Sequence, residues 1–335
     1  MNLKLSVLDQ TPIRNGSNAV EALRESAQLV HLADQLGYTR YWLSEHHNTR
    51  SLAGAAPEVL ISRLAALTTR IRLGSGGIML PNHSTLKVAE NFRLLEALYP
   101  GRIDLGLGRA PGGDRLTSSL LNPSNTFNPQ DYVRQLSDLK AFLSGEPDSE
   151  SGGKVLAIPD ITTQPEYWIL SSSGESAYLA AHFGMALSYA QFINPLMGIE
   201  SAKIYREKFV PSEQLEQPKI NVGIFVFCAP TEKKAYEMQQ MMDYRLFLFE
   251  KGRYDARFSY EEASTYPYSE AEWNRVLFNR SRAVSGTPDL VKEKLTQLAQ
   301  EVTADEIVVS TFTEHAEDRL NSYKLLAEVF ELGKS

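Results

Sequence analysis

Apolar residues along the chain recur in two alternating patterns, one with helical spacing and one as short continuous runs. An apolar stripe at helical spacing runs from Val20 to Val30, between Asn18, which is followed three residues later by Glu21, and Gly37. Asn with Glu at that spacing is typical of a helix N-terminus, and Gly of a helix C-terminus. A short apolar run at 41–44 follows, as expected for a buried strand. The pattern therefore predicts a helix that leads directly into a strand.

The same alternation repeats along the whole chain. Further predicted helices cover 58–68, 87–99, 175–183, 198–209, 232–249, 289–299 and 317–332. The predicted strands are 3–8, 41–44, 71–74, 103–107, 167–170, 186–189, 220–227 and 307–310. Strands separated by helices pair in parallel, and eight such units are the number that closes a TIM barrel.

An open doubly wound sheet is the alternative fold for this alternation. That fold favours a glycine-rich phosphate-binding turn directly after the first strand, whereas this chain has DQTPI at 9–13. The sequence therefore predicts an α/β fold of the TIM (β/α)8 barrel type, as a single domain over residues 1–335.

Two segments interrupt the alternation. Residues 145–164 are rich in Gly, Ser, Pro and acidic residues and are predicted to be a surface loop. Residues 251–288 form an aromatic-rich insertion between strands seven and eight that includes Tyr254, Phe258 and Trp273. Long segments of this kind are either lids over a binding site or extra helices that pack on the barrel or on a second subunit. Both interpretations of 251–288 are open from the sequence.

Charge and cysteine content narrow the class of protein. The chain carries 34 Lys and Arg against 41 Asp and Glu, a net charge of −7, and has no dense basic block that would bind nucleic acid. Its single cysteine, Cys228, excludes an internal disulfide and a multi-cysteine metal site, which fits a reducing compartment. The longest apolar run, around 222–230, is too short to cross a bilayer. We therefore expect a cytoplasmic protein with no membrane or nucleic-acid partner.

In a TIM barrel the chemistry lies where the strands end, at the C-terminal mouth. The second strand runs into SEHH at 44–47. With a strand period of two, His46 shares a face with Trp42 and Ser44, and His47 lies on the opposite face. This alternation disfavours a metal pair at the two histidines and favours His46 as an acid, base or hydrogen-bond donor. Two histidines held only by structural hydrogen bonds are the alternative.

Glycines mark the ends of strands three and four. GSGG at 74–77 places three glycines in four residues, which is typical of an irregular backbone or of a ligand that approaches the main chain. Strand four ends in GLGR at 106–109, where the planar guanidinium of Arg109 suits a phosphate or a carboxylate. A surface ion pair is the alternative role for Arg109.

The fifth strand runs into SSSGES at 171–176 and then into a helix. Small and hydroxyl residues at a helix N-terminus leave backbone N–H groups at the positive end of the helix dipole, which favours bound phosphate. An ordinary N-cap by Ser173 explains the same residues equally well. Arg109 and this segment follow neighbouring strands, which favours a shared anion site.

Taken together, LSEHH at 43–47, GSGGIMLP at 74–81 and YPGRIDLGLGR at 99–109 have the order and spacing of the bacterial luciferase-like flavin monooxygenases. SSSGES at 171–176 and SGTP at 285–288 also resemble that family, so the resemblance covers nearly the whole chain. It is greatest to the luciferase-like FMN oxidoreductases rather than to the light-emitting subunits. The resemblance implies a homodimeric TIM barrel that receives reduced FMN from a separate flavin reductase. It also implies that O₂ is used through a flavin peroxide to oxidise a small organic substrate.

By position, the resemblance implies that His46 is the active-site histidine and that Gly76-Gly77 is a non-proline cis peptide beneath the flavin ring. It further implies a set of FMN-binding residues that follow strands three, four and five: Gly76, Gly77, Gly108, Arg109, Ser172, Ser173, Gly174 and Ser176. Ser172 stands where the luciferase catalytic subunit has a glutamate, and Gly108 where it has a reactive cysteine. No metal site is expected.

Other functions fit the same residues. A deazaflavin-dependent dehydrogenase on the same barrel would transfer hydride and ignore O₂. A flavin-binding protein without turnover is compatible with the changed residues Ser172 and Gly108. A metal hydrolase that uses His46 and His83 has no convincingly spaced carboxylate to join them. No motif identifies the organic substrate.

Overall fold

The computed structural model describes residues 3–124, 126, 128–145, 148–149 and 153–333. Its barrel strands are β1 (Lys4–Asp9), β2 (Arg40–Leu43), β3 (Arg72–Met79), β4 (Ile103–Gly108), β7 (Glu166–Ser171), β8 (Ala186–Ala190), β9 (Ile220–Cys228) and β11 (Glu306–Ser310). They pair in parallel in the order β9-β11-β1-β2-β3-β4-β7-β8, and β8 also pairs with β9, which closes the barrel. The predicted TIM barrel is therefore confirmed.

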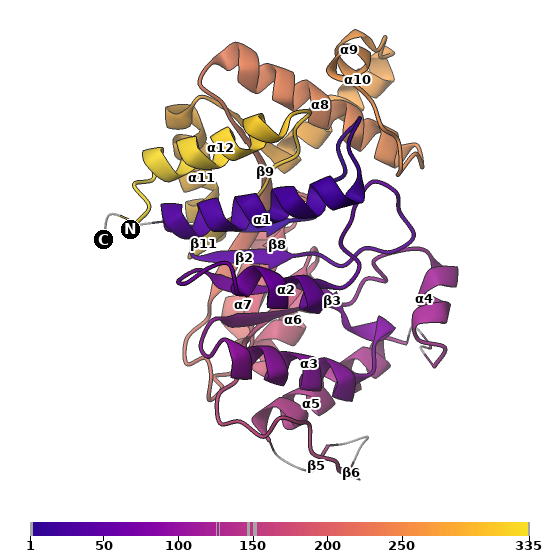
Figure 1. Cartoon of the computed structure of the whole chain (residues 1–335), viewed down its shortest axis with the longest axis vertical. Coiled ribbons are helices and arrows are strands. Elements are labelled where there is room, and N and C mark those ends of the chain that lie inside the picture. The colour runs from indigo at the N-terminus through magenta and orange to yellow at the C-terminus, as the bar shows by residue number, and fades with distance from the viewer. Residues whose placement is uncertain (1–2, 125, 127, 146–147, 150–152, 334–335) are drawn as a thin grey trace.

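Helices cover the outside of this barrel (Figure 1). They are α1 (Ala19–Leu36), α2 (Pro57–Ala65), α3 (Thr85–Leu98), α5 (Pro129–Ser144), α6 (Gly174–Phe183), α7 (Gly198–Lys208), α11 (Pro288–Val302) and α12 (Ala316–Val329). At the start of α1, Asn18 Oδ1 accepts the N–H groups of Val20 at 3.0 Å and Glu21 at 3.1 Å, and Gly37 ends the helix at a φ of 87°. Both predicted ends of this helix are confirmed. No helix in the described ranges is long and apolar enough to span a membrane.

Strand side chains alternate between the helix-facing core and the barrel interior. On β2, Tyr41 and Leu43 belong to the core between strands and helices, whereas Trp42 belongs to a separate cluster with Trp168 of β7. On β9, Ile224 packs in the helix-facing core and Phe225 in another interior cluster. The period of two therefore holds within β2 and β9, although β2 ends at Leu43, before His46.

The interior is charged at the N-terminal end of the barrel. Arg40, at the start of β2, donates to Asp104 Oδ2 at 2.7 Å and to Glu306 Oε1 at 2.8 Å, and all three side chains are buried. Trp42 Nε1 donates to the same Asp104 oxygen at 2.9 Å. These buried groups are hydrogen-bonded to one another, which indicates a structural role. In a TIM barrel the chemistry lies at the opposite, C-terminal mouth.

Residues 145–164 depart from the prediction of a plain surface loop. They contain a two-stranded antiparallel sheet, β5 (Asp148–Ser149) paired with β6 (Gly153–Lys154), while residues 146–147 and 150–152 lie outside the described part. The sequence pattern also gave no boundaries for α4 (Arg115–Leu121) and α5, which follow β4. Short periodic segments next to Gly- and Pro-rich stretches carry too little pattern to place their ends.

The insertion at 251–288 is largely helical. It follows α8 (Glu232–Glu250) and contains α9 (Tyr260–Thr265), α10 (Glu270–Asn279) and β10 (Ala283–Gly286), which pairs with the last part of β9. Figure 1 shows α8, α9 and α10 gathered at one end of the molecule. Phe258 and Tyr266 pack against Tyr244 of α8, with ring centroids 4.9 and 5.2 Å apart.

The start of the insertion also contacts loops at the barrel mouth. Asp255 Oδ1 accepts from Thr49 Oγ1 at 2.6 Å and from the Arg50 N–H at 2.8 Å, in the loop after β2. Arg257 donates to the Ser17 carbonyl at 3.4 Å, in the loop after β1. The insertion therefore joins α8 to the loops that border the mouth on the side of β1 and β2.

Candidate functional site

His46 lies three residues beyond the end of β2. Its Nδ1 is 3.0 Å from Ser44 Oγ, and its backbone N–H donates to the Gly54 carbonyl at 3.0 Å. Burial lowers the pKa of His46 to about 4, so the ring is neutral near pH 7. A neutral imidazole can donate or accept a hydrogen bond at the mouth but does not attract an anion by charge.

The neighbouring histidine belongs to a different cluster. His47 Nε2 and His83 Nε2 lie 2.8 and 2.9 Å from Glu45 Oε1, and the Met79 N–H donates to Glu45 Oε2 at 2.8 Å. Burial raises the pKa of Glu45, but the hydrogen bonds from His47 and His83 outweigh it and bring the pKa to about 2. His46 and His47 thus have separate partners, and Glu45 ties the end of β2 to the loop after β3.

The Gly76–Gly77 peptide at the end of β3 is cis, as the family resemblance implies. A Cβ at Gly76 would lie 3.0 Å from Leu8 Cδ1, and one at Gly77 would lie 2.1 Å from Leu170 Cδ1 and 2.6 Å from the Gly106 carbonyl oxygen. A side chain at Gly77 would clash with the main chain of Gly106, and the packing around Gly76 is tight, so this end of β3 favours glycine.

Arg109 and the start of α6 meet at the mouth between β4 and β7. Arg109 Nη1 lies 2.7 Å from Glu175 Oε1, with the two side chains 34% and 60% exposed. Ser173 is the N-cap of α6, but its side chain makes no capping hydrogen bond. Ser171 Oγ donates to the Ser173 carbonyl at 2.6 Å instead. The surface ion pair considered for Arg109 therefore exists, and it brings the guanidinium to an uncapped helix N-terminus.

A hollow of about 320 Å³ lies beside this ion pair. It is lined by Pro81, Arg109, Asn128, Pro129, Asp131, Tyr132, Gln135 and Glu175. The Tyr132 hydroxyl is buried and has no hydrogen-bond partner among the described residues, and burial raises its pKa. A neutral phenol donor is thus available next to Arg109. Tyr132 was not predictable from the sequence, because it reaches the mouth only through the packing of α5.

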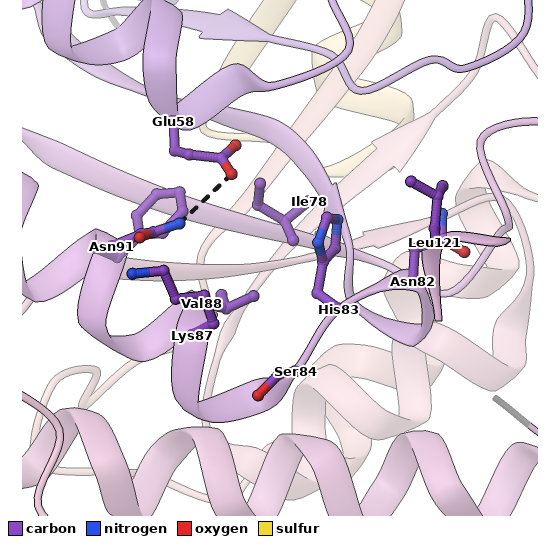
Figure 2. A pocket seen from close by; sticks show the side chains of 10 residues that line it. Glu58, Ile78, Asn82, His83, Ser84, Lys87, Val88, Asn91 and Leu121 are labelled. Carbon is purple, nitrogen blue, oxygen red and sulfur yellow. Dashed lines mark hydrogen bonds between the residues drawn. The ribbon is translucent and has the colours of Figure 1, made fainter. Parts of the chain in front are cut away.

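A second hollow, of about 180 Å³, lies outside the barrel between α2 and α3. Figure 2 shows Glu58 of α2 hydrogen-bonded to Asn91 of α3, with His83 beside them. Lys87 also lines this hollow, so its charged groups are of both signs. The arrangement lacks the concentrated positive charge found at Arg109 and α6, and it does not favour an anion.

Aromatic rings border the mouth at the ends of β8, β9 and β11. Phe225 of β9 lies 5.3 Å from Phe192, which follows β8, and 5.8 Å from Phe312, which follows β11. In the closed barrel, β11 stands opposite β4. We call Phe192, Phe225 and Phe312 the aromatic wall. The strand pattern placed Phe225 in the barrel but did not distinguish it from a core residue.

Comparisons with known proteins agree with this architecture. Residues 1–306 match the protein family described as luciferase-like monooxygenase. The chain is 33% identical over 329 residues to the N-acetyl-S-alkylcysteine monooxygenase of Bacillus subtilis, covering 97% of this chain and 98% of that protein. The crystal structure of apo-MsnO8 matches with a TM-score of 0.91 and 36% identity, over 98% of this chain and 99% of that one.

A more distant structure shares the fold. The oxygenating constituent of 3,6-diketocamphane monooxygenase from the CAM plasmid of Pseudomonas putida, solved in complex with FMN, has a TM-score of 0.74 at 19% identity and covers 100% of this chain and 99% of its own. The family match covers most of the chain, and the chain shares 33% identity with a relative of nearly equal length. Together these two findings establish the family. The chain belongs to the luciferase-like monooxygenase family and is an oxidoreductase of the monooxygenase type.

Proposed function

We propose that the enzyme binds reduced FMN at the C-terminal mouth of its barrel and uses it with O₂ to oxidise a small organic substrate. The observation that supports this most directly is the contact between Arg109 and the N-terminus of α6. A guanidinium, free backbone N–H groups and the unpartnered Tyr132 hydroxyl form a donor set that suits a phosphate, the charged end of FMN. The FMN complex of the Pseudomonas putida neighbour supports the choice of cofactor.

Different residues at the mouth would bind the phosphate and the ring of FMN. Arg109 and the first turn of α6 would hold the phosphate, with the hydroxyls of Ser172, Ser173 and Ser176 and the main chain of Gly174 as further donors. Gly76, Gly77 and Gly108 carry no side chain, so the flavin ring could approach their main chain closely. When bound, FMN supplies the reaction with O₂, which no side chain of the protein can provide.

Two side chains of the protein, His46 and Cys228, are the candidates for proton or thiol chemistry. His46, neutral because its pKa is about 4, would hold or pass a proton at Nδ1 or Nε2 beside the reacting atoms. Cys228 is buried, and burial raises its pKa to about 12, so it supplies no thiolate near pH 7. The proposed chemistry therefore depends on a neutral imidazole and not on a thiol.

The proposal includes the source of the flavin and the setting of the enzyme. A separate reductase would supply reduced FMN, as the resemblance of the strand-end motifs to the luciferase-like flavin monooxygenases implies. We also propose a homodimer in the cytoplasm. Sedimentation velocity of the full chain tests the dimer, and stimulation of O₂ uptake by an added flavin reductase tests the transfer.

The deciding experiment measures flavin binding and O₂ uptake together. We expect saturable quenching of FMN fluorescence by the full chain, weaker binding of riboflavin, and O₂ consumption with reduced FMN. Arg109→Ala should weaken FMN binding while leaving riboflavin unchanged. Arg275→Ala, which removes a surface arginine paired with Glu250 on α8, is the matched control. Binding of a deazaflavin but not of FMN would support the dehydrogenase alternative and contradict the proposal.

A further inference from the structure

Arg245 of α8 faces the aromatic wall at the mouth of the barrel. Its guanidinium carbon lies 4.9 Å from the ring centroid of Phe312 and 5.6 Å from that of Phe258. Phe312 directly follows β11, and Phe258 belongs to the insertion that contacts the mouth loops. The guanidinium is therefore placed at the strand ends opposite Arg109, where α8 and the insertion meet the barrel.

Among the described residues, Arg245 has no counter-ion. Across the described residues no hydrogen bond or ion pair reaches it, and the acidic residues of the same region have other partners: Asp243 binds Arg280, Asp255 binds Thr49, and Glu314 accepts the Tyr260 N–H. Burial alone lowers the pKa of Arg245 to about 10, and no carboxylate offsets that effect. The side chain is still charged near pH 7.

The guanidinium is nevertheless accessible. The Arg245 side chain is partly exposed. Some polar atoms of the described residues are both enclosed and unpartnered, such as Arg282 Nε, but no nitrogen of Arg245 is among them. The buried arginines of the described residues are paired: Arg40 with Asp104 and Glu306, Arg93 with Asp160, and Arg319 with Asp9. Arg245 thus differs from them in combining an aromatic setting, an accessible head group and a missing anion.

We propose that Arg245 binds an anionic group of the organic substrate, so that the substrates are small carboxylates or sulfonates with an apolar body. The planar guanidinium can hold either group through two parallel hydrogen bonds. The apolar body would lie on Phe225 and Phe312 of the aromatic wall. This inference rests on the proposed function, since it assigns the Arg109 side of the mouth to the phosphate of FMN.

The test compares matched anionic and neutral probes. Isothermal titration of the FMN-loaded full chain would use 3-phenylpropanoate against 3-phenylpropanamide and hexanoate against hexanamide. A third pair, 2-phenylethanesulfonate against 2-phenylethanesulfonamide, separates a sulfonate preference from a carboxylate preference. At least one anion should bind tenfold or more tightly than its neutral partner. Arg245→Met should abolish this preference without changing the affinity for the amide, whereas Arg275→Met should leave it unchanged.

The controls separate this inference from the proposed function. FMN fluorescence quenching should differ by less than twofold between Arg245→Met and the parent, because Arg109 and not Arg245 holds the phosphate. Failure of the parent to bind FMN, with a preserved Arg245-dependent anion preference in the flavin-free chain, overturns the proposed function alone. Anions that bind no better than their neutral partners in the parent overturn the inference alone. If Arg245→Met does not fold, Arg245→Lys should keep a reduced anion preference, and its full loss there also overturns the inference.

Discussion

Glu175 competes with any anion for the Arg109 guanidinium. Its replacement should therefore strengthen anion binding rather than weaken it. The Glu175 carboxylate lies 2.7 Å from Arg109 Nη1 in the first turn of α6, where a phosphate would also bind. Arg109 lowers the pKa of Glu175, so this carboxylate is ionised near pH 7. We therefore expect Glu175→Gln to strengthen FMN binding, although it removes an ion pair.

The magnitude follows from the charges. A phosphate held by the same guanidinium would lie about 5 Å from the Glu175 carboxylate, since each oxyanion sits about 2.8 Å from the nitrogens it shares. At that distance two unit charges in water repel by about 0.8 kcal/mol. A phosphate monoester carries a charge of about −1.5 to −2, and salt at physiological strength screens the interaction to about half. The relief is then about 0.6–0.8 kcal/mol, or roughly a threefold to fourfold decrease in the dissociation constant.

Fluorescence titrations of FMN and riboflavin provide the assay. Glu175→Gln should bind FMN about threefold to fourfold more tightly at 0.15 M salt, with the gain shrinking at 1 M salt, and should bind riboflavin as the parent does. Glu250→Gln is the control, because it changes the net charge equally at a partner of Arg275 far along the chain. Weaker binding of FMN by Glu175→Gln would show that the carboxylate positions Arg109 and would refute the reasoning, as would an equal gain for riboflavin.

Three further predictions concern other parts of the molecule. Tyr132→Phe should weaken FMN binding about threefold to tenfold, the range for one lost hydrogen bond, and leave riboflavin binding unchanged in the same titrations; an unchanged FMN affinity would exclude Tyr132 from the phosphate site. Arg40→Met should reduce the free energy of unfolding by about 3–5 kcal/mol in urea denaturation, because Asp104 and Glu306 lose a buried partner, and a loss below about 1 kcal/mol would contradict that account. His46 has a pKa of about 4, below its ordinary 6.5, so the unfolded chain binds this proton first as the pH falls. Its contribution to the free energy of unfolding is therefore complete above pH 6.5 and lost between pH 6.5 and 4, and His46→Asn should flatten the measured pH dependence of stability in that window.

The strands were predictable because each carries a local signal. All eight predicted strands coincide with barrel strands, since buried parallel strands are short apolar runs bounded by turns. The end of β3 is the main exception: the apolar run stops at Gly74, whereas the strand continues through the glycines to Met79. A glycine run resembles a loop in sequence, and only its pairing with β4 makes it a strand.

The candidate site was predictable only where neighbouring residues carry the chemistry. The three motifs that gave the family resemblance are continuous segments at strand ends, and the family assignment they imply is confirmed. Tyr132 and Arg245 lie on helices, and each looks like an ordinary helical residue in the sequence. Their significance comes from a missing partner, which depends on how α5 and α8 pack against the barrel and not on any local pattern.

Because the net charge is −7, anion binding at the mouth depends on individual arginines such as Arg109 and Arg245. An acidic protein offers no general attraction to anions, so each anion must be bound by a local group. Arg109 is already partly neutralised by Glu175, and its neighbourhood is polar and half exposed, which suits a hydrated phosphate. Arg245 has no such neighbour and lies among aromatic rings, which suits an anion attached to an apolar body. Giving Arg245 the kind of neighbour that Arg109 has should therefore remove its preference: an added carboxylate, as in Phe258→Glu, should abolish the selection for anionic probes while leaving FMN binding unchanged.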